Sequence, residues 1–335
     1  MQIFIQILLL IVGFAMLVKG ADWFVDGAVG IAEKFGIPSL VIGLTIVAMG
    51  TSAPEAAISI TAAVKQSAAI SIGNVVGSNI MNILLILGLA SVITPLAVQK
   101  STKRYEMPFV ILISLVLLWE GWDKTVGRID GVILWILFIL YLVYMGVMAK
   151  KGSGKAEDEI SFPTSGHIEG GFAVTQTPAQ VAMDKPMKLW KAIILTLVGL
   201  ALIIFGSDIT VDAATKLAEF AGISQRFIGL TIVALGTSLP ELFTSVNAAR
   251  KGEADIAVGN IVGSNIFNIQ FVLGTSAIIT PVAFAPKFRV DAIVAVTAAV
   301  LLWLLSLNKK QEIKRWGGAL MLVSYAGYFA YLVMK

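Results

Sequence analysis

The chain has 335 residues, of which 57% are hydrophobic and 14% charged, with a formal net charge of +4. A water-soluble domain of this length needs more charge to cover its surface, so the composition excludes an ordinary soluble protein. The chain has no cysteine, which excludes disulfides, thiolate nucleophiles and metal centres built on sulfur. No nucleic-acid partner is expected.

Ten apolar stretches are each long enough to cross a bilayer core of about 30 Å as a helix. In chain order they cover residues 3–25, 38–63, 69–96, 105–122, 129–149, 188–211, 225–249, 255–281, 290–307 and 315–334. The sequence therefore predicts an all-α polytopic membrane protein with ten transmembrane helices.

Between the fifth and sixth stretches lies a polar segment, residues 150–187, which is rich in Gly, Ser, Thr, Pro and charged residues. This composition is typical of a flexible linker. The only histidine, His167, falls here, so histidine catalysis is not available to the membrane part. Lys and Arg are more frequent in the loops on the linker's side of the membrane. The positive-inside rule then places the linker in the cytoplasm and both termini outside, with the protein in the cytoplasmic (inner) membrane.

The chain matches itself at an offset of 186 residues. Gly43–Glu55 repeats as Gly229–Glu241, and Gly73–Asn82 repeats as Gly259–Asn268. Each copy contains five predicted helices, an odd number, so the second copy must enter the membrane from the opposite side. We therefore expect two inverted five-helix repeats, residues 1–149 and 188–335, an architecture found in many secondary transporters.

One helix of each copy is expected to break near the middle of the bilayer. Pro54 lacks an N–H and clashes with the carbonyl of Gly50, and Pro240 does the same to Gly236. Such breaks expose backbone carbonyls, including those of Ala48 and Ala234. Exposed carbonyls at this depth are tolerated only where protein, water or an ion satisfies them.

Oxygen-bearing side chains surround both breaks at spacings of three and four residues, so that several share one helix face. They are Thr51, Ser52, Glu55, Asn74, Ser78 and Asn82 in the first copy, and Thr237, Ser238, Glu241, Asn260, Ser264 and Asn268 in the second. Brought together, the two half-sites form an all-oxygen cage with two carboxylates. Such a cage suits Na+ and Ca2+ and does not suit soft transition metals.

Charge favours a functional role for Glu55 and Glu241. A carboxylate at the bilayer centre costs roughly 2.5 to 3.5 kcal/mol on insertion scales, so a structural glutamate would need a basic partner. The candidate partners in the motif helices, Lys65, Arg250 and Lys251, fall at predicted helix ends that face water. We expect no buried lysine or arginine, so that protons or a bound cation neutralise the two acids.

At these motifs the chain resembles the sodium/calcium exchanger branch of the Ca2+/cation antiporter superfamily. Gly50–Glu55 with Gly77–Asn82, and Gly236–Glu241 with Gly263–Asn268, are similar to that family's two alpha-repeats. The resemblance implies a central site, shared by Ca2+ and Na+, at Glu55 and Glu241. It also implies that the first and sixth helices slide against the rest to alternate access. The flanking Na+ sites that it implies are lined by Thr51, Ser52, Ser78, Ala48, Thr237, Ser238, Ser264 and Ala234.

Position 268 is variable within that family. Some relatives, including K+-dependent ones, have an aspartate there, whereas Asn268 here mirrors Asn82. The cage then has two carboxylates and is neutral with one Ca2+, which favours K+-independent exchange of Ca2+ for Na+. Protons should compete for the same carboxylates.

Three other functions are weighed against this one. A Ca2+/H+ antiporter uses the same pairs of glutamates and asparagines, but its usual motif lacks the Thr-Ser-x-Pro-Glu block. A passive channel favours a pore between subunits, whereas this site is internal to one chain, so a monomer suffices. An enzyme is least favoured because no nucleophile–base pair is present, and no cofactor is expected beyond the transported ions.

Overall fold

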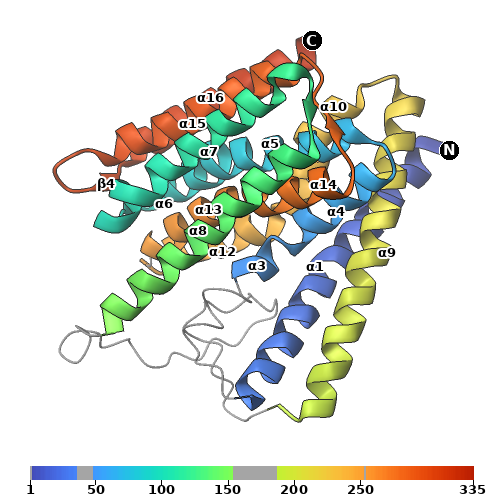
Figure 1. Cartoon of the computed structure of the whole chain (residues 1–335). Helices are drawn as coiled ribbons and strands as arrows, with labels where there is room; N and C mark the ends of the chain where they lie inside the picture. Colours follow the sequence, from blue (N-terminus) through green and yellow to red (C-terminus); the bar gives the residue numbers. More distant parts are fainter. Residues whose placement is uncertain (1, 36–47, 154–186, 253) are drawn as a thin grey trace.

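The structure, a computed structural model, describes residues 2–35, 48–153, 187–252 and 254–335. This part of the chain is almost entirely helical (Figure 1). The start of the predicted second helix, residues 38–47, lies outside the described residues, as do His167 and most of the predicted linker.

The first half consists of α-helices joined by short turns of other helix types. Its elements are α1 (Gln2–Lys34), α3 (Ala48–Thr51), α4 (Ala53–Val64), α5 (Ala68–Met81), the π-helical turn η2 (Asn82–Leu87), α6 (Gly88–Ile93), η3 (Thr102–Glu106), α7 (Met107–Glu120), η4 (Gly121–Asp123) and α8 (Arg128–Ser153).

The second half is built in a similar way, again with long α-helices and π-helical turns. Its elements are α9 (Leu189–Ala221), α10 (Gln225–Ile228), the π-helical turn η5 (Gly229–Val233), α11 (Ala234–Thr237), α12 (Leu239–Arg250), α13 (Ala254–Phe267), the π-helical turn η6 (Asn268–Leu273), α14 (Gly274–Ile279), α15 (Phe288–Ser306) and α16 (Arg315–Met334). Two antiparallel strand pairs tie the connections of the two halves together. They are β1 (Leu96–Ala97) with β4 (Glu312–Ile313), and β2 (Thr125–Val126) with β3 (Val282–Ala283).

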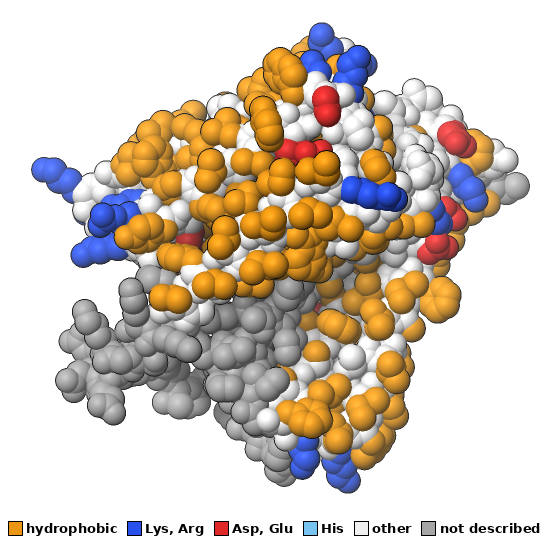
Figure 2. Space-filling view, in the orientation of Figure 1, with side chains coloured by type: hydrophobic (Ala, Val, Ile, Leu, Met, Phe, Trp, Pro, Cys, Tyr) orange, Lys and Arg blue, Asp and Glu red, His pale blue; other side chains and the backbone are white. Residues whose placement is uncertain are grey.

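Among the described residues, eight helices are long and apolar enough to cross a membrane. Gln225–Thr237 and Leu239–Arg250, which are bent by 52° at the break between them, bring the number to nine if the pair is counted as one broken span. Hydrophobic side chains cover much of the visible surface, while charged side chains gather toward its edges (Figure 2). An apolar outer surface of this kind is stable in lipid and not in water. The prediction of an all-α polytopic membrane protein is confirmed.

Helices α1 and α9 lie side by side as a pair of long helices at one side of the molecule (Figure 1). Their backbones touch at glycines. A methyl group added to Gly20 would lie 2.9 Å from the carbonyl oxygen of Gly199, and one added to Gly199 would lie 2.7 Å from that of Gly20. Gly13 and Gly206 approach each other in the same way further along the two helices. Small residues that let two backbones approach are the usual basis of close helix packing in membranes.

Both helices of this pair extend further than predicted. Helix α1 ends at Lys34 and not near residue 25, and α9 ends at Ala221 and not near residue 211. Asp22, Asp26 and Asp208 therefore lie inside these helices. The apolar pattern underestimated the length because the last turns of both helices are more polar, and such turns can continue a helix with their charged side chains exposed.

The expectation of no buried basic residue is wrong for Arg226 in α10, which is only 8% exposed. Its guanidinium donates two hydrogen bonds to Asp291 of α15, over 2.7 and 2.6 Å, and Tyr328 donates a third to the same carboxylate over 3.0 Å. A bidentate pair satisfies both charges at this depth. Because Arg226 forms its ion pair with Asp291, this arginine does not neutralise either motif glutamate.

Candidate cation-binding site

The predicted helix breaks are present in both copies of the motif. Helix α3 ends at Thr51 and α4 begins at Ala53, while α11 ends at Thr237 and α12 begins at Leu239. Ser52 and Ser238 stand between them with non-helical backbone angles, and a proline opens each following helix. Proline suits the first turn of a helix because the N–H that it lacks has no helical partner there.

Glu55 and Glu241 lie in the first turns of α4 and α12. Both are fully buried. The free backbone N–H groups and the positive end of the helix dipole favour negative charge at this position. The two breaks therefore place each carboxylate where the backbone itself stabilises it.

The serines of the breaks cross over between the two copies. Ser52 Oγ donates to Glu241 Oε1 over 3.3 Å, and Ser238 Oγ donates to Glu55 Oε1 over 3.2 Å. Ser264 of α13 also donates to Glu241 Oε1 over 3.3 Å and lies 3.2 Å from Ser52 Oγ. The two half-sites are thus joined directly through side chains whose positions differ by 189 and 183 residues.

Each glutamate keeps one oxygen without a hydrogen-bond partner among the described residues, namely Glu55 Oε2 and Glu241 Oε2. Neither glutamate takes part in the ion pairs found in the described part of the chain. A buried, unpaired carboxylate is costly unless a proton or a cation neutralises it. The arrangement can therefore hold a cation between two oxygen-rich half-sites.

The other predicted hydroxyl groups surround the same breaks. Thr237 Oγ1 lies 3.0 Å from Asn74 Oδ1 and 3.2 Å from the carbonyl oxygen of Ala234, and Ser78 Oγ lies 3.5 Å from Thr237 Oγ1. Ser78, Thr237 and Ala234 are buried, whereas Thr51 is half-buried. Ala48 begins α3, and its side chain lies outside the described residues.

Asn74 and Asn260 brace the broken helices. The amide of Asn74 donates to the carbonyl oxygen of Glu55 over 3.2 Å and to Ser59 Oγ over 2.9 Å. Asn260 donates to Ser245 Oγ over 3.3 Å at the matching place in the second copy. Because these amides donate to groups of α4 and α12, we interpret them as residues that stabilise the positions of these two helices.

Asn79 and Asn265, which sequence reasoning did not single out, connect the two copies at the centre of the protein. Asn79 Nδ2 donates to the carbonyl oxygen of Asn265 over 3.2 Å, and Asn265 Nδ2 donates to that of Asn79 over 3.1 Å. Their side-chain oxygens accept hydrogen bonds from the predicted site residues Asn268 and Asn82. Asn79 and Asn265 occupy matching positions of the two copies, 186 residues apart, and this match was the signal that could have revealed them.

The chain matches the family model described as "Sodium/calcium exchanger protein" over residues 5–147 and 191–334. The chain belongs to the sodium/calcium exchanger family. The members of this family are transporters and not enzymes, and the chain is an integral membrane protein. The resemblance inferred from the two motif blocks is thereby confirmed.

Several proteins are similar to this chain over most of its length. Inner membrane protein YrbG of Escherichia coli is 39% identical over 304 residues, 88% of either chain. Sodium/calcium exchanger MaX1 of Methanosarcina acetivorans is 33% identical over 365 residues and 99% of either chain. A solved structure of the sodium-calcium exchanger NCX_Mj, soaked with Na+ and Sr2+, covers 98% of either chain at 33% identity with a TM-score of 0.62.

Proposed function

We propose that this protein exchanges Ca2+ for Na+ across the membrane by alternating access, independently of K+. The observation that carries the proposal is the pair of fully buried glutamates, each bound by the serine of the other copy and each with a free oxygen. Membership of the exchanger family supports it, as do the names of MaX1 and NCX_Mj, which describe sodium/calcium exchangers.

The donor set fits these ions chemically. Carboxylate, hydroxyl and carbonyl oxygens are the ligands that Ca2+ prefers, and Na+ accepts the same hard donors. Two carboxylates neutralise one Ca2+, and Asn268 adds no third charge, which favours exchange without K+. The proposed site residues are Glu55, Glu241, Thr51, Thr237, Ser52, Ser238, Ser78, Ser264, Asn82 and Asn268, with the backbone carbonyls of Ala48 and Ala234.

We propose ten transmembrane helices arranged as two inverted five-helix repeats, residues 1–149 and 188–335, joined by a linker over residues 150–187. The reciprocal contacts Ser52–Glu241 and Ser238–Glu55 support two-fold related copies. The glycine contacts between α1 and α9 support the movement of these two helices as one unit. The similarity to YrbG, named an inner membrane protein, supports the inner membrane as the location, with the linker in the cytoplasm and both termini outside.

The coupling ion can be tested by reconstituting the purified protein in liposomes and measuring uptake of radioactive Ca2+. A Na+ gradient directed outward, at equal pH on both sides, should drive Ca2+ accumulation, and adding K+ to both sides should leave the rate unchanged. Uptake driven by a pH gradient without Na+, and not by a Na+ gradient, would overturn the proposal in favour of Ca2+/H+ exchange.

A further inference from the structure

The four buried asparagines of the second motif block, Asn79, Asn82, Asn265 and Asn268, form a closed hydrogen-bonded group across the two copies. Each is at most 3% exposed. Asn82 Nδ2 donates to Asn265 Oδ1 over 3.0 Å, and Asn268 Nδ2 donates to Asn79 Oδ1 over 3.1 Å. Asn79 and Asn265 also each donate to the backbone carbonyl of the other. Each of these hydrogen bonds therefore has a counterpart in the other copy.

The backbone determines which way each amide points. A carbonyl oxygen can only accept, so Asn265 must present its NH2 group to the carbonyl of Asn79. Its oxygen then faces Asn82, which must present its own NH2 group in turn. In the second copy, the carbonyl of Asn265 likewise accepts from the NH2 group of Asn79, whose oxygen then accepts from the NH2 group of Asn268. If Asn82 or Asn268 turned over, two oxygen atoms would be brought together.

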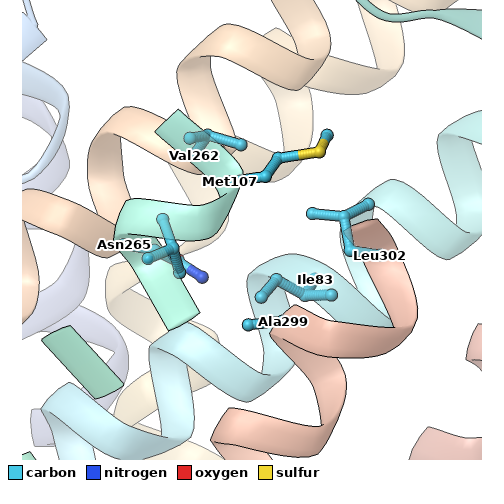
Figure 3. Close-up of a pocket in the computed structure, with 7 residues that line it drawn as sticks. Ile83, Met107, Val262, Asn265, Ala299 and Leu302 are labelled. Atoms are coloured by element: carbon cyan, nitrogen blue, oxygen red, sulfur yellow. The ribbon is translucent and has the colours of Figure 1, made fainter. Parts of the chain in front are cut away.

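The neighbours of Asn265 in one pocket are apolar, so its amide finds no other hydrogen-bond partner there. Ile83, Met107, Val262, Ala299 and Leu302 line a pocket with it and offer its amide no hydrogen-bond partner there (Figure 3). A buried amide keeps its hydrogen bonds where apolar groups are the alternative, because a lost bond is not replaced by water. The orientation of Asn265 is therefore firmly held, and that of Asn82 follows from it.

The consequence is that Asn82 and Asn268 turn their oxygens away from the group. Asn82 Oδ1 and Asn268 Oδ1 have no hydrogen-bond partner among the described residues, as is also true of Glu55 Oε2 and Glu241 Oε2. Asn82 lies one helical turn beyond Ser78, and Asn268 one turn beyond Ser264, on the same helix faces. All four free oxygens thus belong to the proposed site residues.

We propose that Asn79 and Asn265 are positioning residues, which fix the amides of Asn268 and Asn82 so that each presents an oxygen, and not an NH2 group, to the transported cation. They act through the amide that they hold and do not bind the cation themselves. The inference rests on the proposed function, because it assumes that Asn82 and Asn268 face the ion.

The role can be tested through the apparent KM for Ca2+ in Na+-driven uptake into liposomes. Asn79→Ala frees the amide of Asn268 to turn its NH2 group toward the cation, so the KM should rise about tenfold with the maximal rate within about twofold. Ser114→Ala is the matched control, since it removes a buried hydroxyl that bonds only to the carbonyl of Val110 in α7. The control should leave the KM unchanged.

A second substitution distinguishes orientation from a general loss of structure. An aspartate at position 268 presents an oxygen whichever way it turns. Asn79→Ala should therefore change the KM of an Asn268→Asp protein by less than about twofold, although it changes that of the wild type by about tenfold. The mirror pair, Asn265→Ala with Asn82→Asp, repeats the cycle through the other copy and serves if Asn79→Ala does not fold.

The outcomes separate the two proposals. A wild-type protein that accumulates no Ca2+ in response to a Na+ gradient overturns the proposed function. Wild-type exchange with an unchanged KM in Asn79→Ala overturns the positioning role alone. If Asn79→Ala raises the KM about tenfold both with Asn and with Asp at position 268, the positioning role is also overturned. Asn79 would then not act by orienting the side chain at position 268.

Discussion

At the buried centre, Ser52 donates to Glu241 and Ser238 donates to Glu55, so the two copies make the same contact in both directions. At the ends of α4 and α12 the copies differ. Lys65 Nζ lies 2.6 Å from Asp208 Oδ1 and 2.7 Å from Asp212 Oδ1 on α9. The matching residue Lys251 is exposed and forms no ion pair in the described part of the chain, and the matching Asp22 lies 3.9 Å from Lys19.

Under the proposed alternating access, this difference is what one of the two states requires. A site that both sides use in turn must present the same ligands to both, whereas the routes to it must differ at any one moment. Thr61 and Ser207, whose hydroxyl oxygens are 3.0 Å apart, add a second contact between α4 and α9. We interpret the contact between α4 and α9 as the closed route, and the predictions that follow test the likeness at the centre and the difference at the ends.

The largest effect is expected at the glutamates. Glu55→Gln and Glu241→Gln should each reduce Na+-driven Ca2+ uptake at least about a hundredfold, because each removes half of the charge that neutralises Ca2+. Glu219→Gln is the control, since Glu219 is an exposed glutamate on α9. The same loss in both variants would support a site that is alike in the two copies. Full exchange in either would refute the assignment of that glutamate.

A smaller effect is expected at the two serines that cross between the copies. Ser52→Ala removes hydrogen bonds to Glu241 and Ser264, and Ser238→Ala removes the bond to Glu55. A hydrogen bond to a charged group contributes about 1.5 to 3 kcal/mol, so the apparent KM should rise at least about tenfold in each. Titrations of uptake with Ca2+ and with Na+ measure the change. A much larger effect of Ser52→Ala than of Ser238→Ala would show that Glu241 depends more on the serine of the other copy than Glu55 does.

The breaks at Pro54 and Pro240 and the burial of both glutamates could be predicted from the sequence. Proline acts on its own helix, and an internal repeat shows that the same local arrangement occurs twice. The assignment of individual ligands stays a prediction. The crossing of Ser52 to Glu241 could not be predicted, because helical spacing relates Ser52 only to residues of its own copy, such as Glu55.

The buried arginine shows the same limit. Arg226 stands at the start of an apolar stretch, where a basic residue usually reaches water. Its burial depends on Asp291 and Tyr328, which are 65 and 102 positions further along the chain. Asn79 and Asn265 were missed for a related reason, since their partners lie in the other copy and periodicity describes one helix at a time.

The smallest effect is expected at the ion pairs of Lys65. Partial burial lowers the pKa of the Lys65 ammonium, but its hydrogen bonds to Asp208 and Asp212 raise the pKa by more, so the group stays charged. All three side chains are partly exposed, and exposed ion pairs contribute about 0.2 to 1 kcal/mol each. Because one ammonium is shared by the two aspartates, a total of about 1 kcal/mol is expected for both pairs, so Lys65→Gln should shift the balance between the two states about fivefold. It should do so in favour of opening between α4 and α9.

The absence of cysteine from the chain provides a direct measurement of that shift. A cysteine introduced as Ser207→Cys, at a position that is buried against Thr61, reports on opening through its rate of labelling by a water-soluble maleimide. Lys65→Gln should raise this rate about threefold, whereas Lys251→Gln should leave it unchanged because Lys251 holds neither helix. Equal rates in the two variants would mean that the ion pairs of Lys65 do not hold α4 against α9. The difference between the two ends would then be a difference of surface charge and not of access.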